Sequence, residues 1–107
     1  MLVIIDYGSG NLRSVAKALE RVSDNKHAIS VTSNAADLKK ASHIILPGVG
    51  AFADCMKGLT ALPGMIDAMQ DAVHHHSKWF LGICVGMQML FESGHEYGKH
   101  SGLGWLK

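Results

Sequence analysis

Short runs of apolar and β-branched residues alternate along this chain with segments whose apolar residues fall at helical spacing. We predict strands over the runs 2–5 (LVII), 27–32 (HAISVT), 43–46 (HIIL) and 79–83 (WFLGI). Continuous apolar runs are typical of strands that are covered on both faces. Because strands that alternate with helices pair in parallel through right-handed crossovers, the chain is predicted to be an α/β protein with a parallel sheet and flanking helices.

Between these runs the spacing and the end signals indicate helices. Asn11 is a candidate N-cap for a helix whose apolar face is Leu12, Val15, Ala16, Leu19 and Val22. A short helix is predicted over 34–40, and another after the Pro-Gly pair at 63–64. Residues 85–91 are also predicted to be helical, and the glycine-rich segment from Glu92 onward is predicted to be loop.

Composition excludes several classes of protein. A chain of 107 residues with 48% hydrophobic residues, 18% charged residues and a net charge of +1 indicates one folded domain and predicts no nucleic-acid partner. Its longest nearly apolar run, 79–87, is far shorter than a membrane span, and Met1–Asp6 lacks the features of a signal peptide. Two cysteines form no disulfide framework, so we expect free thiols, a cytoplasmic location and no membrane partner.

The sequence Gly82-Ile83-Cys84-Val85-Gly86 lies between a predicted strand and a predicted helix. This is the nucleophile-elbow pattern, in which small flanking residues allow a sharp, strained turn, with Cys in place of the usual Ser. The N–H groups and the dipole of a helix N-terminus favour a thiolate, so Cys84 is predicted to be a nucleophile. The alternative is a buried packing cysteine, which is our interpretation of Cys55.

A glycine-rich turn, Pro47-Gly48-Val49-Gly50, follows the third predicted strand. Such a turn can present backbone N–H groups to an anion, although by itself it is equally a tight turn. The carboxyl ends of parallel strands meet at one edge of the sheet, where ligands bind. We therefore expect this loop to lie beside Cys84 and to complete an oxyanion hole with the Val85 amide.

Three segments together resemble the class I (triad) glutamine amidotransferases, and among them the glutaminase subunits of imidazole glycerol phosphate synthases. They are 6–14 (DYGSGNLRS), 46–52 (LPGVGAF) and 82–88 (GICVGMQ). The resemblance covers the whole chain in order and spacing, although most relatives have Pro-Gly-Gly in the loop and leucine at the position of Val85. It implies a flavodoxin-like sheet, with residues 1–107 as the N-terminal portion of one amidotransferase domain.

The resemblance implies that glutamine is hydrolysed through a thioester on Cys84. The ammonia would pass to a cyclase subunit, a (β/α)8 barrel, for imidazole glycerol phosphate formation in histidine biosynthesis. It further implies that the amides of Val49 and Val85 form the oxyanion hole, and that the backbone end of glutamine is held by Gly50, Gln88 and Glu96. Segment 6–11 would lie near the cyclase interface, and no cofactor or metal is implied.

The family also needs a His and a Glu from a His-Pro-Glu turn, and this sequence contains no such segment. Consecutive helical positions such as 74–76 cannot converge on one metal ion, and they precede the strand, at the end of the sheet away from Cys84. His95 and His100 are candidate surrogate bases, but loop positions are their default interpretation. We therefore expect an N-terminal half that lacks the group that protonates the leaving ammonia.

Two other functions are compatible with this sequence. One is a different thiol enzyme with an elbow cysteine on a flavodoxin-like sheet, although such enzymes usually carry His directly after the Cys, where this chain has Val85. The other is a non-catalytic fragment or docking module that associates through apolar surface left bare by the missing half.

Overall fold

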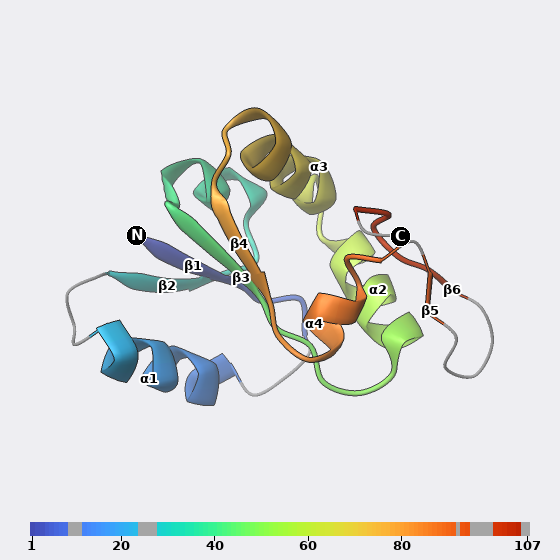
Figure 1. Ribbon diagram of the computed structural model, residues 1–107, viewed down its shortest axis with the longest axis horizontal. Helices are drawn as coiled ribbons and strands as arrows, with labels where there is room; N and C mark the ends of the chain where they lie inside the picture. The colour runs from blue at the N-terminus through green and yellow to red at the C-terminus, as the bar shows by residue number, and fades with distance from the viewer. Residues whose placement is uncertain (9–11, 24–27, 92, 95–99, 106–107) are drawn as a thin grey trace.

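The computed structural model describes residues 1–8, 12–23, 28–91, 93–94 and 100–105. Its centre is a parallel sheet of four strands in the order β2-β1-β3-β4, shown in Figure 1. The strands are β1 (Leu2–Ile5), β2 (Ile29–Thr32), β3 (His43–Leu46) and β4 (Trp79–Gly82). This is the flavodoxin-like strand order, so the predicted α/β fold is confirmed.

Helices and short ladders connect and extend the sheet. The helical elements are α1 (Leu12–Ser23), the 3₁₀ helix η1 (Ala35–Lys40), α2 (Phe52–Ala61), α3 (Met65–Gln70), the π-helical turn η2 (Asp71–His75) and α4 (Val85–Gln88). Two-residue strands β5 (Ser93–Gly94) and β6 (His100–Ser101) pair in antiparallel fashion. No helix in the described ranges has the length and apolar character needed to cross a membrane.

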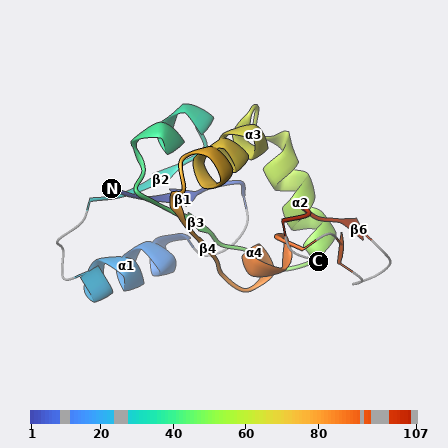
Figure 2. The same ribbon diagram turned by 45° about the horizontal axis from the view of Figure 1, so that its top comes forward.

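The main core lies on one face of the sheet. Figures 1 and 2 show η1 and α3 on one side of the strands and α1 on the other. The sheet residues Val3, Ile5, Ile44 and Leu46 pack against apolar side chains from the helices, chiefly Leu38, Phe52, Leu59, Met65 and Met69. As predicted, η1 begins after Asn34, whose side chain accepts a hydrogen bond from the Ala36 amide at 3.0 Å.

Continuous apolar runs favour strands that are covered on both faces, and β4 departs from this pattern. In β1 and β3 the residues at 3–5 and 44–46 are buried, as continuous apolar runs predict. In β4, however, Trp79 and Leu81 are 73% and 51% exposed. The reason is position: β4 is an edge strand of the described sheet, and burial there depends on neighbours that a local pattern does not reveal.

The chain after β4 also differs from the sequence prediction. Helix α4 ends at Gln88 rather than at residue 91, and the amides of Leu90 and Phe91 bond to carbonyls three residues back instead of four. Beyond the helix, the carbonyls of Met89 and Phe91 accept hydrogen bonds from Leu103 and Gly104 at 2.8 and 3.1 Å. The β5–β6 ladder lies within the segment predicted to be loop. Helix α2, which contains Cys55, spans ten residues.

Three glycines allow β3, β4 and α4 to meet closely. An added Cβ on Gly86 would lie 1.9 Å from the carbonyl oxygen of Leu46, and one on Gly82 would lie 2.6 Å from the Cα of Met87. An added Cβ on Gly48 would lie 2.6 Å from the amide nitrogen of Gly86. No side chain fits at these contacts, so the glycines determine how closely the turn after β4 approaches the end of β3.

We predict that Gly86→Ala destabilises the fold by about 3 kcal/mol or more, because the new methyl group meets rigid backbone rather than a movable side chain. Gly8→Ala is the control: Gly8 has φ of +90° and open space around it, so only the left-handed conformation is penalised, by about 1–2 kcal/mol. Urea unfolding measures both variants, and equal losses would contradict the steric argument.

Candidate functional site

Cys84 lies in a strained turn between β4 and α4. Its backbone angles are φ 55° and ψ −121°, and among the described non-glycine residues only Ser77 also has a positive φ. The turn is closed by hydrogen bonds from the Gly86 amide to the Ile83 carbonyl at 2.9 Å and from the Met87 amide to the Cys84 carbonyl at 3.0 Å. Strain of this kind is concentrated at functional sites, and the thiol-bearing residue is exposed.

The Pro47–Gly50 loop lies beside this turn, as expected. Leu46 is paired with Gly82, and the Ile83 amide continues the ladder by donating to the Leu46 carbonyl at 3.0 Å. The next contact joins the two loops directly, since the Val85 amide donates to the Gly48 carbonyl at 3.3 Å. The carboxyl ends of β3 and β4 therefore bring the glycine-rich loop and the cysteine turn together.

This contact also bears on the expected oxyanion hole. The Val85 N–H, which was expected to bind an oxyanion, donates to a carbonyl of the neighbouring loop in this structure. An oxyanion can use that donor only when the Gly48 carbonyl moves away. The side chain of Val49 is 65% exposed, and Gly50 has φ of +101°, so the loop crosses the surface in a conformation that glycine favours.

The buried side chains of Tyr7 and Cys55 contact backbone carbonyls of the Pro47–Gly50 loop. The Tyr7 hydroxyl donates to the Pro47 carbonyl, and an added Cβ on Gly48 would lie 2.8 Å from the same hydroxyl oxygen. Cys55, which is buried as expected of a packing residue, directs its Sγ at the Val49 carbonyl at 3.5 Å. The support from Tyr7 was not expected; the available signal is that a buried tyrosine needs a hydrogen-bond partner.

A small cavity lies under the same loop. It has a volume of about 250 Å³, and Gly8, Val49, Gly50 and Asp54 are among its lining residues. This is smaller than the pockets that usually enclose small ligands. Gln88, expected to contact substrate, is exposed at the end of α4, one helical turn beyond Cys84.

Some expected site residues lie outside the described part of the chain. These are Glu96, the candidate base His95, and residues 9–11 of the 6–11 segment that was expected near the interface, which include the candidate N-cap Asn11. For His100 the backbone belongs to β6, and its side chain is not described. The roles of these residues therefore stay predictions.

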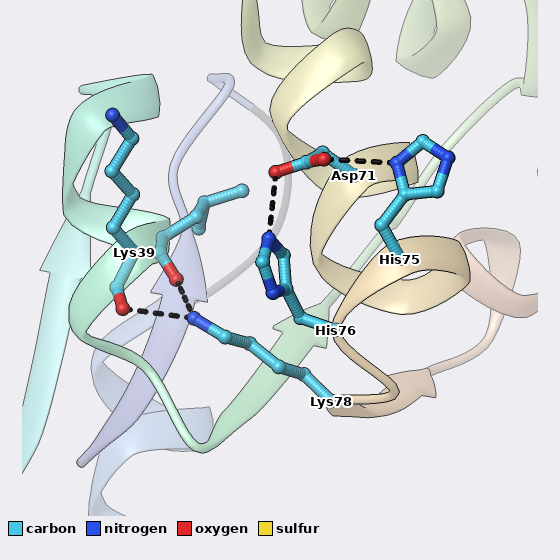
Figure 3. A network of polar contacts seen from close by, with 6 residues as sticks. Lys39, Asp71, His75, His76 and Lys78 are labelled. Carbon is cyan, nitrogen blue, oxygen red and sulfur yellow. Dashed lines mark hydrogen bonds and ion pairs between the residues drawn. The ribbon is translucent and has the colours of Figure 1, made fainter.

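A polar network joins the histidine run to a carboxylate at the opposite end of the sheet. Figure 3 shows Asp71 between two imidazoles, with Oδ1 2.9 Å from Nδ1 of His75 and Oδ2 3.3 Å from Nε2 of His76. Nearby, the Lys78 ammonium donates to the carbonyls of Leu38 and Lys39 at 2.7 and 2.9 Å, which ties the end of η1 to the start of β4.

This network is structural rather than catalytic. It precedes β4, whereas Cys84 follows that strand, so the two groups lie at opposite sheet ends. Within the described ranges no group of three histidine, cysteine or acidic side chains could hold a metal ion. The hydrogen bond from His75 lowers the pKa of Asp71 below its usual value of 3.8, with weaker contributions from His76.

Comparisons with known proteins agree with the geometry. A family model described as glutamine amidotransferase class-I matches residues 3–101. The chain is 51% identical over 106 residues to a protein of Zymomonas mobilis subsp. mobilis named imidazole glycerol phosphate synthase subunit HisH, and 49% identical over 108 residues to the protein of that name in Rhodospirillum rubrum.

These alignments cover 99% and 98% of this chain but 50% of each relative, so the chain spans about half their length. A solved structure described as the crystal structure of glutamine amidotransferase superposes with a TM-score of 0.70 at 22% identity. The superposition covers 95% of this chain and 51% of the solved one. At that identity the likeness supports the fold.

We predict that Cys84 is alkylated by iodoacetamide before Cys55. Cys84 is exposed, whereas Cys55 is 1% exposed and packed in the core, so only the first thiol can be reached without opening the fold. Peptide mapping after limited labelling gives the order. Labelling of Cys55 first, in folded protein, would overturn the assignment of the accessible thiol.

The pH dependence of stability in the variant Asp71→Asn tests the polar network around Asp71. Because the pKa of Asp71 is lowered in the folded protein, the native state favours the carboxylate. The resulting stabilisation is present above the ordinary aspartate range and is lost as the pH falls below it. The wild type and Asp71→Asn should differ slightly in the midpoint of thermal unfolding at neutral pH, because the carboxylate is exposed. This difference should vanish on acidification. Asp67→Asn, on the exposed surface of α3, is the control.

Proposed function

The chain belongs to the class-I glutamine amidotransferase family, and on that premise we propose that it provides the nucleophile half of a glutaminase. The observation that carries the proposal is the exposed Cys84 in its strained turn, in contact with the glycine-rich loop through the Val85 amide. A thiol at this position can attack a carbonyl carbon beside backbone donors, which is the requirement of acyl transfer.

The proposed reaction begins with attack of the Cys84 thiolate on the carboxamide carbon of glutamine. The carbonyl oxygen becomes an oxyanion that the amides of Val49 and Val85 stabilise, once the Gly48 carbonyl no longer occupies the second donor. The C–N bond then breaks, the nitrogen takes a proton and leaves as ammonia, and a thioester remains on Cys84. Water hydrolyses the thioester to glutamate and restores the thiol.

The same proposal assigns substrate contacts to Gly50, Gln88 and Glu96, which would hold the α-amino and α-carboxylate groups of glutamine. Gly50 and Gln88 are exposed and belong to the two segments that meet at this edge of the sheet, which supports their assignment. Glu96 lies outside the described residues and is assigned by resemblance alone.

The ammonia is proposed to pass to a cyclase subunit, a (β/α)8 barrel, that makes imidazole glycerol phosphate in histidine biosynthesis. The support is the name shared by relatives about 50% identical to this chain, subunits of imidazole glycerol phosphate synthase. The segment that begins at Asp6, at the same sheet edge as Cys84, is proposed to lie near this partner. The assembly is proposed to be cytoplasmic and to need no cofactor.

The described residues around Cys84 include no histidine that could donate a proton to the leaving nitrogen. Among the histidines whose side chains the structure describes, His43 begins β3 and residues 74–76 precede β4, so all of them lie at the sheet end away from Cys84. We infer that this chain is the N-terminal portion of the domain, and that the other half carries the donor. The isolated chain should then be at least about 10²-fold slower than the completed site.

The test is a chimera in which this chain is joined to the half of the Zymomonas mobilis protein that it does not match. It should release ammonia from glutamine, and Cys84→Ala should lower that rate by several orders of magnitude because the nucleophile is lost. His75→Ala, at the other sheet end, is the control and should leave the rate unchanged. A folded chimera without Cys84-dependent ammonia release would refute the proposed function.

A further inference from the structure

Three consecutive carbonyls of the loop 47–50 accept hydrogen bonds from three different parts of the chain. The first accepts from the Tyr7 hydroxyl, the second from the Val85 amide at 3.3 Å, and the third from the Cys55 thiol at 3.5 Å. Tyr7 follows β1, Val85 begins α4 and Cys55 lies in α2. Two core side chains therefore fix the carbonyls on either side of the one that contacts the cysteine turn.

The middle carbonyl belongs to the peptide group that joins Gly48 to Val49. That planar group also carries the Val49 N–H, which the proposed function uses as a donor to the oxyanion. Because a peptide group turns as one unit, the direction of this N–H depends on the backbone at both of its ends. The hydrogen bonds to the two neighbouring carbonyls hold that backbone at both ends, so they bear on where the donor points.

Packing gives the Tyr7 hydroxyl a fixed position. Tyr7 is 7% exposed and belongs to the main core. On the helix side, an added Cβ on Gly58 of α2 would lie 2.7 Å from the Tyr7 carbonyl oxygen and 3.2 Å from its ring carbon Cδ2. On the loop side, an added Cβ on Gly48 would lie 2.8 Å from the hydroxyl oxygen. The tyrosine is therefore enclosed between α2 and the loop, and its hydroxyl is held where it donates to the Pro47 carbonyl.

Cys55 holds the far end of the loop at two atoms. Its amide donates to the Ala51 carbonyl at 3.1 Å, while its Sγ contacts the Val49 carbonyl. The residue is 1% exposed, so both contacts are shielded from water. Because a thiol is a weak hydrogen-bond donor, we expect its effect on the loop to be smaller than that of the tyrosine hydroxyl.

We propose that Tyr7 is a positioning residue for the oxyanion hole and that Cys55 assists it. Neither side chain is assigned a contact with glutamine. Tyr7 acts through the Pro47 carbonyl, which fixes the backbone from which the Val49 N–H reaches the oxyanion. The inference rests on the proposed function and deepens it, because it explains why a buried hydroxyl is directed at this loop.

The experiment uses the covalent chimera described above and the variant Tyr7→Phe, which keeps the ring and removes the hydroxyl. The kcat for ammonia release should fall about tenfold or more, because oxyanion donors act in the transition state. The KM for glutamine should change by less than about threefold, since the residues proposed to bind its backbone end are untouched. Alkylation of Cys84 by iodoacetamide forms no oxyanion, so its rate should stay unchanged.

Ser42→Ala is the matched control. It also removes a hydroxyl, one that donates to the Met1 carbonyl at 3.0 Å just before β3, at the sheet end away from Cys84. Its kcat should equal that of the wild type. A Tyr7→Phe variant with wild-type kcat would overturn the proposal, and so would a parallel loss of kcat and of the Cys84 alkylation rate, which indicates general disruption of the site.

Amide hydrogen exchange in the 107-residue chain measures the loop without glutaminase chemistry. The Val85 amide donates to the loop, whereas the Ile83 amide donates to the Leu46 carbonyl at 3.0 Å, just before it. Tyr7→Phe should speed exchange at Val85 several-fold and leave Ile83 unchanged, and Cys55→Ala should have the same effect to a smaller extent. Equal acceleration at both amides, or none at Val85, would contradict the proposal even if the chimera proves inactive.

Discussion

The close contact between Gly86 and the carbonyl of Leu46 is the constraint on which the arrangement of this protein depends. Only a residue without a Cβ can place its backbone there, since an added carbon would lie 1.9 Å from the carbonyl oxygen. The contact draws the start of α4 against the end of β3, and the strained backbone of Cys84 results from making that turn within a few residues. The exposed thiol and the glycine-rich loop therefore adjoin because this close backbone contact, together with the hydrogen bond from the Val85 amide to the Gly48 carbonyl, holds the two turns together.

The loop beside Cys84 is held at several points of different strength. Buried Tyr7 and Cys55 contact the carbonyls of Pro47 and Val49 from below, while the Gly48 carbonyl takes the amide of Val85. At 3.3 Å this last bond is long for an N–H···O hydrogen bond. Under the proposed function its loss frees a donor for the oxyanion, which links loop conformation to the ability to stabilise the transition state.

Different functional groups lie at the two ends of the sheet. The carboxyl end has the thiol and the loops, whereas at the amino end Asp71 pairs with His75 and His76 within and just after η2, and Lys78 ties the start of β4 to η1. Under the proposed function, the proton donor comes from a segment that follows Cys84 in sequence. That segment can share an active site with Cys84 only if it returns to the carboxyl end of the sheet. The exposed side chains of Trp79 and Leu81 lie on β4, the strand that leads directly into Cys84.

Local patterns in the sequence determined much of this protein. The bounds of β1 and β3, the Asn34 cap, the turn at Cys84 and its meeting with the 47–50 loop all follow from residue spacing and from parallel strand pairing. Only the tertiary structure decided the early end of α4, the exposure of Trp79, the β5–β6 ladder and the use of the Val85 amide by a neighbouring loop. The physical reason is that each of these depends on hydrogen-bond partners or covering segments distant in sequence, which a local pattern does not encode.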